Sequence, residues 1–145
     1  MTQEYKELLL KDLCARLPYN VICKVEFRES GEYKSKNMFL SGVFTDEAYF
    51  TTESGSIYSN EYKPYLFPLS SLTEKQRNNI SKLLIDTQNE FSPYGKINMK
   101  GCDNLFICSV KQSNALINYC LTNHLDINSL IEKGLAVDAT GLNIY

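Results

Sequence analysis

The sequence predicts an α+β fold in which an N-terminal helix and a run of short strands precede a mainly helical half. Its 145 residues match the size of a single domain. Residues 20–62 alternate between apolar and polar side chains and are interrupted by short turns, which is typical of antiparallel strands. Residues 74–137 instead show the apolar spacing of helices.

The first helix is expected over residues 3–17. Acidic residues lie early in this stretch and basic residues lie late, which complements the helix dipole, and Pro18 ends the helix. Its predicted apolar face consists of Tyr5, Leu8, Leu9, Leu13, Cys14 and Leu17.

Four short strands are expected next, at about residues 20–29, 36–44, 48–52 and 57–62. Phe44 is expected on the same inward side as Met38 and Leu40, and Gly42 indicates a bulge within that strand. Tight turns between the strands predict a four-stranded antiparallel meander, and such a meander can curl toward a small barrel.

Residues 63–73 are predicted to form an extended connector between the β part, residues 1–62, and the helical part. Pro64 and Pro68 fix their own φ angles and disfavour helix at the preceding residues. Leaving the large apolar side chains of this stretch in water would cost roughly 1.5–3 kcal/mol each, so the connector is expected to press against a core. Thr73 and Gln76 then form the pattern of a capping box that starts a helix.

The remaining residues are predicted to be mainly helical. Helices are expected at about residues 74–89, after a Ser113 cap, and after an Asp126 cap with a stop at Gly134. Residues 104–110 and 135–137 are possible strands. The last residues, 138–145, are expected to form a poorly held tail.

Composition argues against several classes of function. The net charge is −2 and the pI is about 5.4, so the chain has no general attraction to nucleic acid or anionic membranes. No apolar run reaches the roughly 18 residues of a membrane span, and the N-terminus does not resemble a signal peptide. Five cysteines, an odd number without a CxxC motif, predict free thiols in a cytoplasmic protein.

No catalytic or metal-binding motif stands out. His124 is the only histidine, and it lies one helical turn after Cys120, a spacing that could pair an imidazole with a thiol. Cys120 is expected on an apolar helix face, however, where a thiol is inert, so a structural or solvent-facing histidine is the preferred interpretation. Cys102, Cys108 and His124 are the best available metal ligands, and they do not form a ligand cluster. We therefore expect no metal and no cofactor.

A second candidate function is single-strand nucleic-acid binding. Four lysines and four tyrosines are interleaved in the β part, and small barrels can stack bases on aromatic rings within a basic groove. These residues are Lys24, Lys34, Lys36, Lys63, Tyr33, Tyr49, Tyr58 and Tyr62. Neighbouring acidic residues dilute the positive charge, and ordinary solvent-facing strand positions explain the lysines equally well.

The connector supplies the candidate partner-binding residues, Tyr62, Lys63, Tyr65 and Phe67. This is more aromatic surface than a linker needs, and aromatic residues are enriched in protein interfaces. The alternative, that these aromatics all belong to the core, stays open at this point.

Two stretches resemble a family of short, uncharacterised proteins of gut Bacteroidales and their phages and prophages. One is the connector run KPYLFPLSSLTE from Lys63 to Glu74, and the other is NHLD from Asn123 followed by LIEKGLA from Leu130. Leu125 stands where the family usually has an aromatic residue. No activity is attached to that family, so the resemblance implies a bacterial cytosol and a mobile genetic element but no residue role.

These observations predict a non-enzymatic protein-binding or adaptor protein of a phage or mobile element, with an unknown protein partner. A nucleic-acid-associated accessory protein and an enzyme of unrecognised type are the alternatives.

Overall fold

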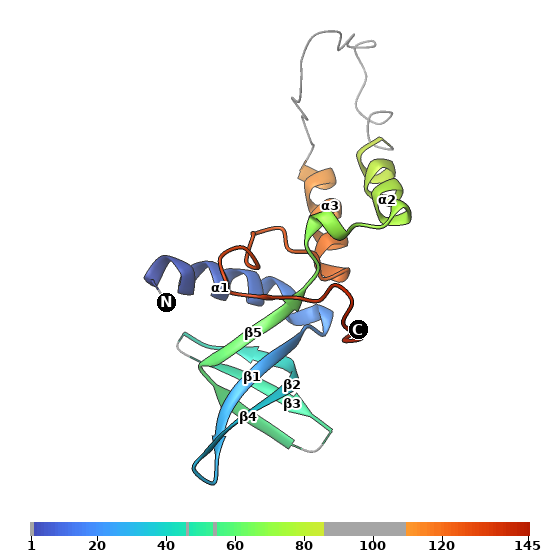
Figure 1. Cartoon of the computed structure of the whole chain (residues 1–145). Coiled ribbons are helices and arrows are strands. Elements are labelled where there is room, and N and C mark those ends of the chain that lie inside the picture. Colours follow the sequence, from blue (N-terminus) through green and yellow to red (C-terminus); the bar gives the residue numbers. More distant parts are fainter. Residues whose placement is uncertain (1, 46, 54, 86–109) are drawn as a thin grey trace, which may run out of the picture. The chain divides into compact units, whose positions relative to one another are not determined.

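The computed structural model describes residues 2–45, 47–53, 55–85 and 110–145. It has a mixed α+β fold with an N-terminal helix, a mostly antiparallel sheet and further helices (Figure 1). Two compact units can be distinguished. The first comprises Met1–Ser71 with Leu121–Tyr145, and the second comprises Leu72–Cys120.

The N-terminal helix α1 (Gln3–Arg16) confirms the first predicted element. Thr2 caps it by accepting a hydrogen bond from the backbone N–H of Tyr5 at 3.3 Å. A 3₁₀ turn, η1 (Leu17–Tyr19), follows with Pro18 in its first turn, and Asn20 ends it in the left-handed region at φ 52°.

The buried stripe of α1 differs from the predicted apolar face. It runs through Leu9, Asp12, Leu13 and Arg16, which recur at helical spacing and include two charged residues. Cys14, predicted to face inward, is exposed because it lies off this stripe.

The sheet contains six strands: β1 (Ile22–Glu29), β2 (Glu32–Val43), β3 (Ala48–Thr52), β4 (Gly55–Ser59), β5 (Glu61–Leu66) and β6 (Val137–Asp138). Their spatial order is β4-β3-β2-β1-β5-β6. All neighbouring pairs are antiparallel except β5 and β6, which are parallel.

The predicted fourth strand is divided in two at Asn60. β4 pairs with β3 at one edge of the sheet, whereas β5 pairs with β1 and includes the start of the predicted connector. Because a single residue separates the two strands, the sheet bends until the end of β4 reaches β1. The Ser59 hydroxyl, for example, donates to the Glu26 carbonyl at 2.8 Å.

The core lies between α1 and one face of the sheet. Leu9 and Leu13 pack there with inward residues of the strands and with Leu130, Leu135 and Ala136 from the C-terminal segment. The opposite sheet face carries polar and aromatic residues, among them Phe39, which is 47% exposed.

The C-terminal segment departs from the predicted helix and loose tail. Asp126 does act as a cap, because its carboxylate accepts hydrogen bonds from the N–H groups of Leu130 (2.8 Å) and Ile131 (2.9 Å). The residues after Asp126 form turns rather than a helix, and Ser129 among them adopts a positive φ of 54°. The expected tail is instead anchored. Ala139 is fully buried, and its N–H donates to the Leu66 carbonyl at 2.8 Å.

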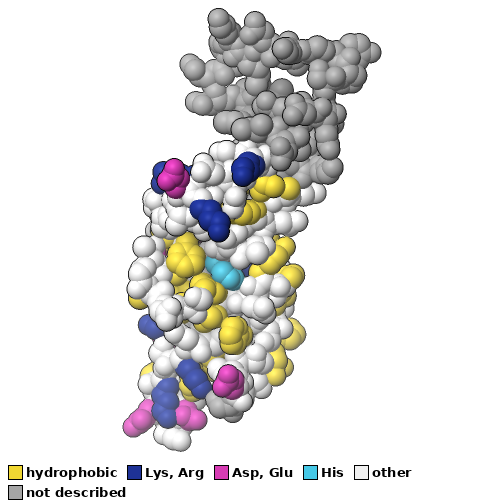
Figure 2. All heavy atoms as spheres, turned by 90° about the vertical axis from the view of Figure 1, so that its right-hand side faces the viewer, with side chains coloured by type: hydrophobic (Ala, Val, Ile, Leu, Met, Phe, Trp, Pro, Cys, Tyr) yellow, Lys and Arg dark blue, Asp and Glu magenta, His cyan; other side chains and the backbone are white. Residues whose placement is uncertain are grey.

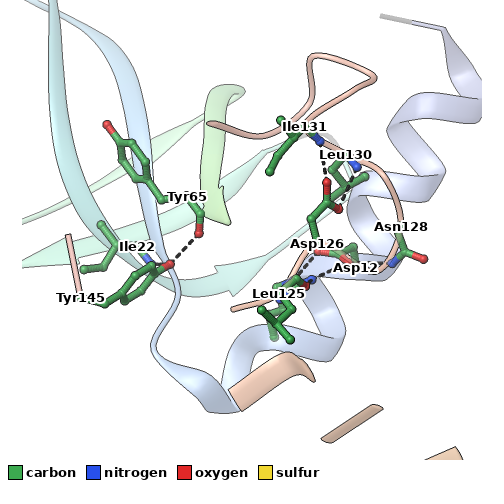
Figure 3. A network of polar contacts seen from close by, with 10 residues as sticks. Asp12, Ile22, Tyr65, Leu125, Asp126, Asn128, Leu130, Ile131 and Tyr145 are labelled. Carbon is green, nitrogen blue, oxygen red and sulfur yellow. Dashed lines mark hydrogen bonds and ion pairs between the residues drawn. The ribbon is translucent and has the colours of Figure 1, made fainter. Parts of the chain in front are cut away.

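The C-terminal segment also pairs with the residue that directly follows β5. The Phe67 N–H donates to the His124 carbonyl at 2.9 Å, and the Asp126 N–H donates to the Phe67 carbonyl at 2.8 Å. Further along, the Tyr145 hydroxyl accepts from the Ile22 N–H at 3.3 Å and donates to the Tyr65 carbonyl at 2.8 Å (Figure 3). The hydroxyl thus bridges β1 and β5 just beyond their last paired residues.

A buried ion pair within α1 makes hydrogen bonds to the C-terminal segment. The Arg16 Nε lies 2.6 Å from the Asp12 carboxylate, and both side chains are inaccessible to solvent. Arg16 Nη2 also donates to the Leu125 carbonyl at 2.8 Å, and Asn128 Nδ2 donates to Asp12 at 2.7 Å. Figure 3 shows Asp12 facing Asn128 across this junction.

The second unit contains α2 (Glu74–Ile85) and most of α3 (Val110–Thr122). The predicted capping box is confirmed, since the N–H of Gln76 bonds to Thr73 Oγ1 and the N–H of Thr73 bonds to Gln76 Oε1. Ser113 lies inside α3 rather than at its cap, because the helix already begins at Val110. The rest of the predicted strand at 104–110 and the end of the predicted helix at 86–89 lie outside the described residues.

Removing the Tyr145 hydroxyl should destabilise the first unit. We expect Tyr145→Phe to lower the free energy of unfolding by about 1–2 kcal/mol, because the Ile22 N–H and the Tyr65 carbonyl lose their shared partner. Tyr33→Phe is the control, since Tyr33 is 68% exposed, and it should change stability by less than about 0.5 kcal/mol. Equal urea midpoints for the two variants would contradict the bridging role.

Candidate functional site

The four candidate residues of the connector do not form one exposed patch. Tyr62 is half-buried against the core, with its ring centroid 5.1 Å from that of Phe50, whereas Lys63 is exposed on the opposite sheet face. Tyr65 is only 7% exposed, and its hydroxyl donates to Asn37 at 3.0 Å. Successive residues of a strand point to opposite faces, which separates Tyr62 from Lys63 and Tyr65, and burial distinguishes Tyr65 from the exposed Lys63.

The fourth connector residue, Phe67, lies just after β5. It is half-buried, and its ring centroid lies 6.0 Å from that of Tyr145. The Phe67 ring therefore belongs to a cluster of rings around Tyr145 in the C-terminal segment.

His124 belongs to the same cluster around Tyr145, and its contacts are those of a structural residue. Its imidazole stacks on the Tyr145 ring, with centroids 3.8 Å apart and planes inclined by 10°. Burial, together with the nearby charge of Arg16, lowers its pKa to about 4. Figure 2 shows this histidine at the surface among hydrophobic side chains.

Neither Cys120 nor His124, weighed above as a thiol–imidazole pair, has the properties of a catalytic group. With a pKa of about 4, the His124 imidazole is neutral at pH 7 and is a weak base. Cys120 is 5% exposed, and a buried thiol is usually unreactive. Cys102 and Cys108, the other metal-ligand candidates, lie outside the described residues.

Two of the four lysines of the β part, Lys24 and Lys34, are paired with acidic groups. Lys24 lies 3.4 Å from Glu26, and Lys34 pairs with Glu29, where its hydrogen bond and charge lower the pKa of that carboxyl. Tyr33 has its ring face covered by the Arg28 guanidinium at 4.6 Å. These contacts weaken the case for a basic groove.

A hollow of about 530 Å³ opens where the β2–β3 turn meets the β4–β5 junction. It is lined by Phe44, Thr45, Glu47, Tyr58, Ser59 and Asn60. None of these residues was among the predicted partner-binding residues. A smaller hollow of about 60 Å³ shares part of this lining and continues toward α1, where Lys6, Leu9 and Leu10 line it.

Two exposed aromatic rings form the apolar part of the hollow. Phe44 is 52% exposed and Tyr58 is 57% exposed, and their ring centroids lie 6.0 Å apart. Tyr58 also contacts Tyr49, with centroids 4.9 Å apart. The walls are held by hydrogen bonds, because the Phe44 N–H donates to the Glu47 carbonyl at 2.9 Å and the Glu61 N–H donates to the Ser59 hydroxyl at 3.0 Å.

The exposure of Phe44 corrects the prediction that it faces the core. The pairing of β2 with β3 shifts register between Leu40 and Gly42, which confirms the bulge expected at the glycine. One extra residue in a strand reverses the inward and outward alternation after it. Val43 therefore packs against the core and Phe44 points outward. Gly42 was the only sequence signal for this change.

Truncating Tyr65 tests whether the connector aromatics are structural. We expect Tyr65→Ala to lower the free energy of unfolding by roughly 3–5 kcal/mol, because a buried aromatic ring is lost. Lys63→Ala, at the exposed position two residues earlier, should cost less than about 0.5 kcal/mol. Denaturant melts measure both values, and a small loss for Tyr65→Ala would restore an exposed patch at this position.

The single histidine gives an unambiguous titration. Its NMR signals should titrate with a midpoint near pH 4 rather than 6.5. The unfolded chain takes up the proton first as the pH falls, so stability is lost between pH 6.5 and 4. We expect this loss to be on the order of 1–2 kcal/mol, discounted because the ring is only half-buried.

His124→Asn is the matched variant for that titration, because asparagine tolerates the left-handed backbone at φ 54°. It should flatten the pH dependence of stability over the same interval. A histidine midpoint near 6.5 would contradict the burial of the ring.

Comparisons of the chain with protein-family models, curated proteins and solved structures found no match. Within the described parts of the chain, no three His, Cys, Asp or Glu residues are grouped so that they could hold a metal ion. No helix of those parts combines the length and the apolar character needed to cross a bilayer. The function proposed for the chain therefore rests on its own residues.

Proposed function

We propose that the chain is a non-enzymatic protein-binding or adaptor protein, and that it contacts its protein partner at the hollow between Phe44 and Tyr58. The observation that carries this proposal is the pair of half-exposed aromatic rings at the mouth of one hollow. Aromatic residues are enriched in protein interfaces and dominate their energetic hot spots.

The local structure supports a role in binding. Both rings lie on backbone held by hydrogen bonds at a turn and a strand junction, so little conformational entropy would be lost when a partner docks. A large aromatic ring left half in water recovers free energy only when a ligand covers it. The hollow is wide enough for one or two side chains of a polypeptide.

The setting proposed for this activity is the cytoplasm of a bacterium, and the gene would belong to a phage or mobile element. The resemblance of the connector and of the NHLD and LIEKGLA segments to short proteins of gut Bacteroidales and their phages supports it. The protein partner would then be a host or phage protein.

Selection from a library of displayed random peptides tests the proposal and does not require the partner to be identified. The native chain should enrich a peptide family, and the double variant Phe44→Ala, Tyr58→Ala should bind those peptides about tenfold or more weakly. Tyr33→Ala removes a tyrosine that is even more exposed, at 68% against 57% for Tyr58, from the β1–β2 hairpin and should leave binding unchanged. Circular dichroism and thermal melts would verify that each variant is folded.

Peptides that bind the native chain and the double variant equally well would contradict the proposal.

A gel shift with single-stranded DNA and RNA, repeated at rising salt, tests the nucleic-acid alternative. Salt-sensitive binding would favour that alternative, because phosphate contacts weaken steeply with ionic strength.

A further inference from the structure

We propose that the hollow receives a cationic side chain, arginine or lysine, of the protein partner, held between the rings of Phe44 and Tyr58 and the carboxylate of Glu47. This inference rests on the proposed function and specifies the chemistry of the residue that docks.

The aromatic walls suit a cation. A guanidinium or ammonium group is attracted to the face of an aromatic ring when it lies within about 6 Å of the ring centroid. Phe44 and Tyr58 have centroids 6.0 Å apart, so one cation at the mouth of the hollow can lie within about 6 Å of both centroids. The contact of Tyr58 with Tyr49 restricts the orientation of the Tyr58 ring.

The charge of the lining agrees with this choice. Glu47 is the only charged residue among those that line the main hollow in the described part of the chain, and no lysine or arginine lines it. Thr45 and Asn60 also line the hollow and carry neutral hydroxyl and amide oxygens that can accept hydrogen bonds from a cation. Lys6 lines only the smaller hollow toward α1, so a partner's cation is favoured at the Glu47 side.

The chain itself contains a matched control for this contact. Tyr33 is also strongly exposed, but the Arg28 guanidinium already lies 4.6 Å from its ring centroid. An added cation should therefore contact Tyr58 in preference to Tyr33.

NMR titration with blocked arginine, N-acetyl-arginine methylamide, tests the inference directly. The neutral comparison is the same compound with citrulline, which keeps the shape of the side chain and removes its charge. At constant ionic strength, the arginine compound should shift the signals of Phe44, Glu47 and Tyr58 saturably and bind about five- to tenfold more tightly than the citrulline compound. The signals of Tyr33 should stay in place.

Two variants assign the site. Glu47→Gln keeps the size of the side chain and should weaken binding of blocked arginine about three- to tenfold. Tyr58→Phe keeps the ring and should bind blocked arginine as the native chain does, whereas Tyr58→Ala should lose saturable binding. Native-like amide spectra would show that the variants are folded.

Equal binding of the arginine and citrulline compounds, or no saturable shift with either, would overturn the inference. Its failure is distinct from failure of the proposed function. Displayed peptides that need Phe44 and Tyr58 but carry no lysine or arginine would refute only the cationic side chain. Saturable arginine binding without any selected peptide would refute only the peptide-binding role.

Discussion

The first unit depends on burying the ion pair between Asp12 and Arg16. Removing two charges from water costs several kcal/mol per ion, which is offset only when further hydrogen bonds complete the pair. Two of those bonds come from Leu125 and Asn128, more than a hundred residues further along the chain. Helix α1 can therefore bury its charged stripe only when the C-terminal segment is in place.

That segment in turn completes β5. Pro64 lies within this strand without an N–H to donate, and β6 begins to pair with β5 only at Tyr65. The backbone groups of Phe67 then bond to His124 and Asp126, and the Tyr145 hydroxyl bridges β1 and β5. Strand β5 thus pairs with β1 on one side and with the C-terminal segment on the other. This position explains why the connector aromatics contact the folded chain.

The same geometry leaves the opposite end of the sheet open. The bulge near Gly42 turns Phe44 outward, and the single residue Asn60 brings β4 and β5 together beside it. Among the described residues, the exposed rings of Phe44 and Tyr58 and the acidic residue Glu47 line the hollow where the two turns converge. The hollow that we propose as a binding site is therefore a consequence of how the sheet bends.

The sequence by itself determined the N-terminal helix, its end near Pro18, the alternation of the first strands and the capping box at Thr73. Each of these depends on residues within a few positions of one another, where spacing and backbone preference decide the outcome. Tertiary structure decided the rest. It buried Asp12 and Arg16 on a face expected to be apolar, turned the predicted Asp126 helix into a capped turn, and held the tail through Tyr145. It also gave the connector aromatics different degrees of burial and formed the hollow around Phe44 and Tyr58. Contacts between distant residues and a one-residue shift in register, which decide these features, leave almost no local signal.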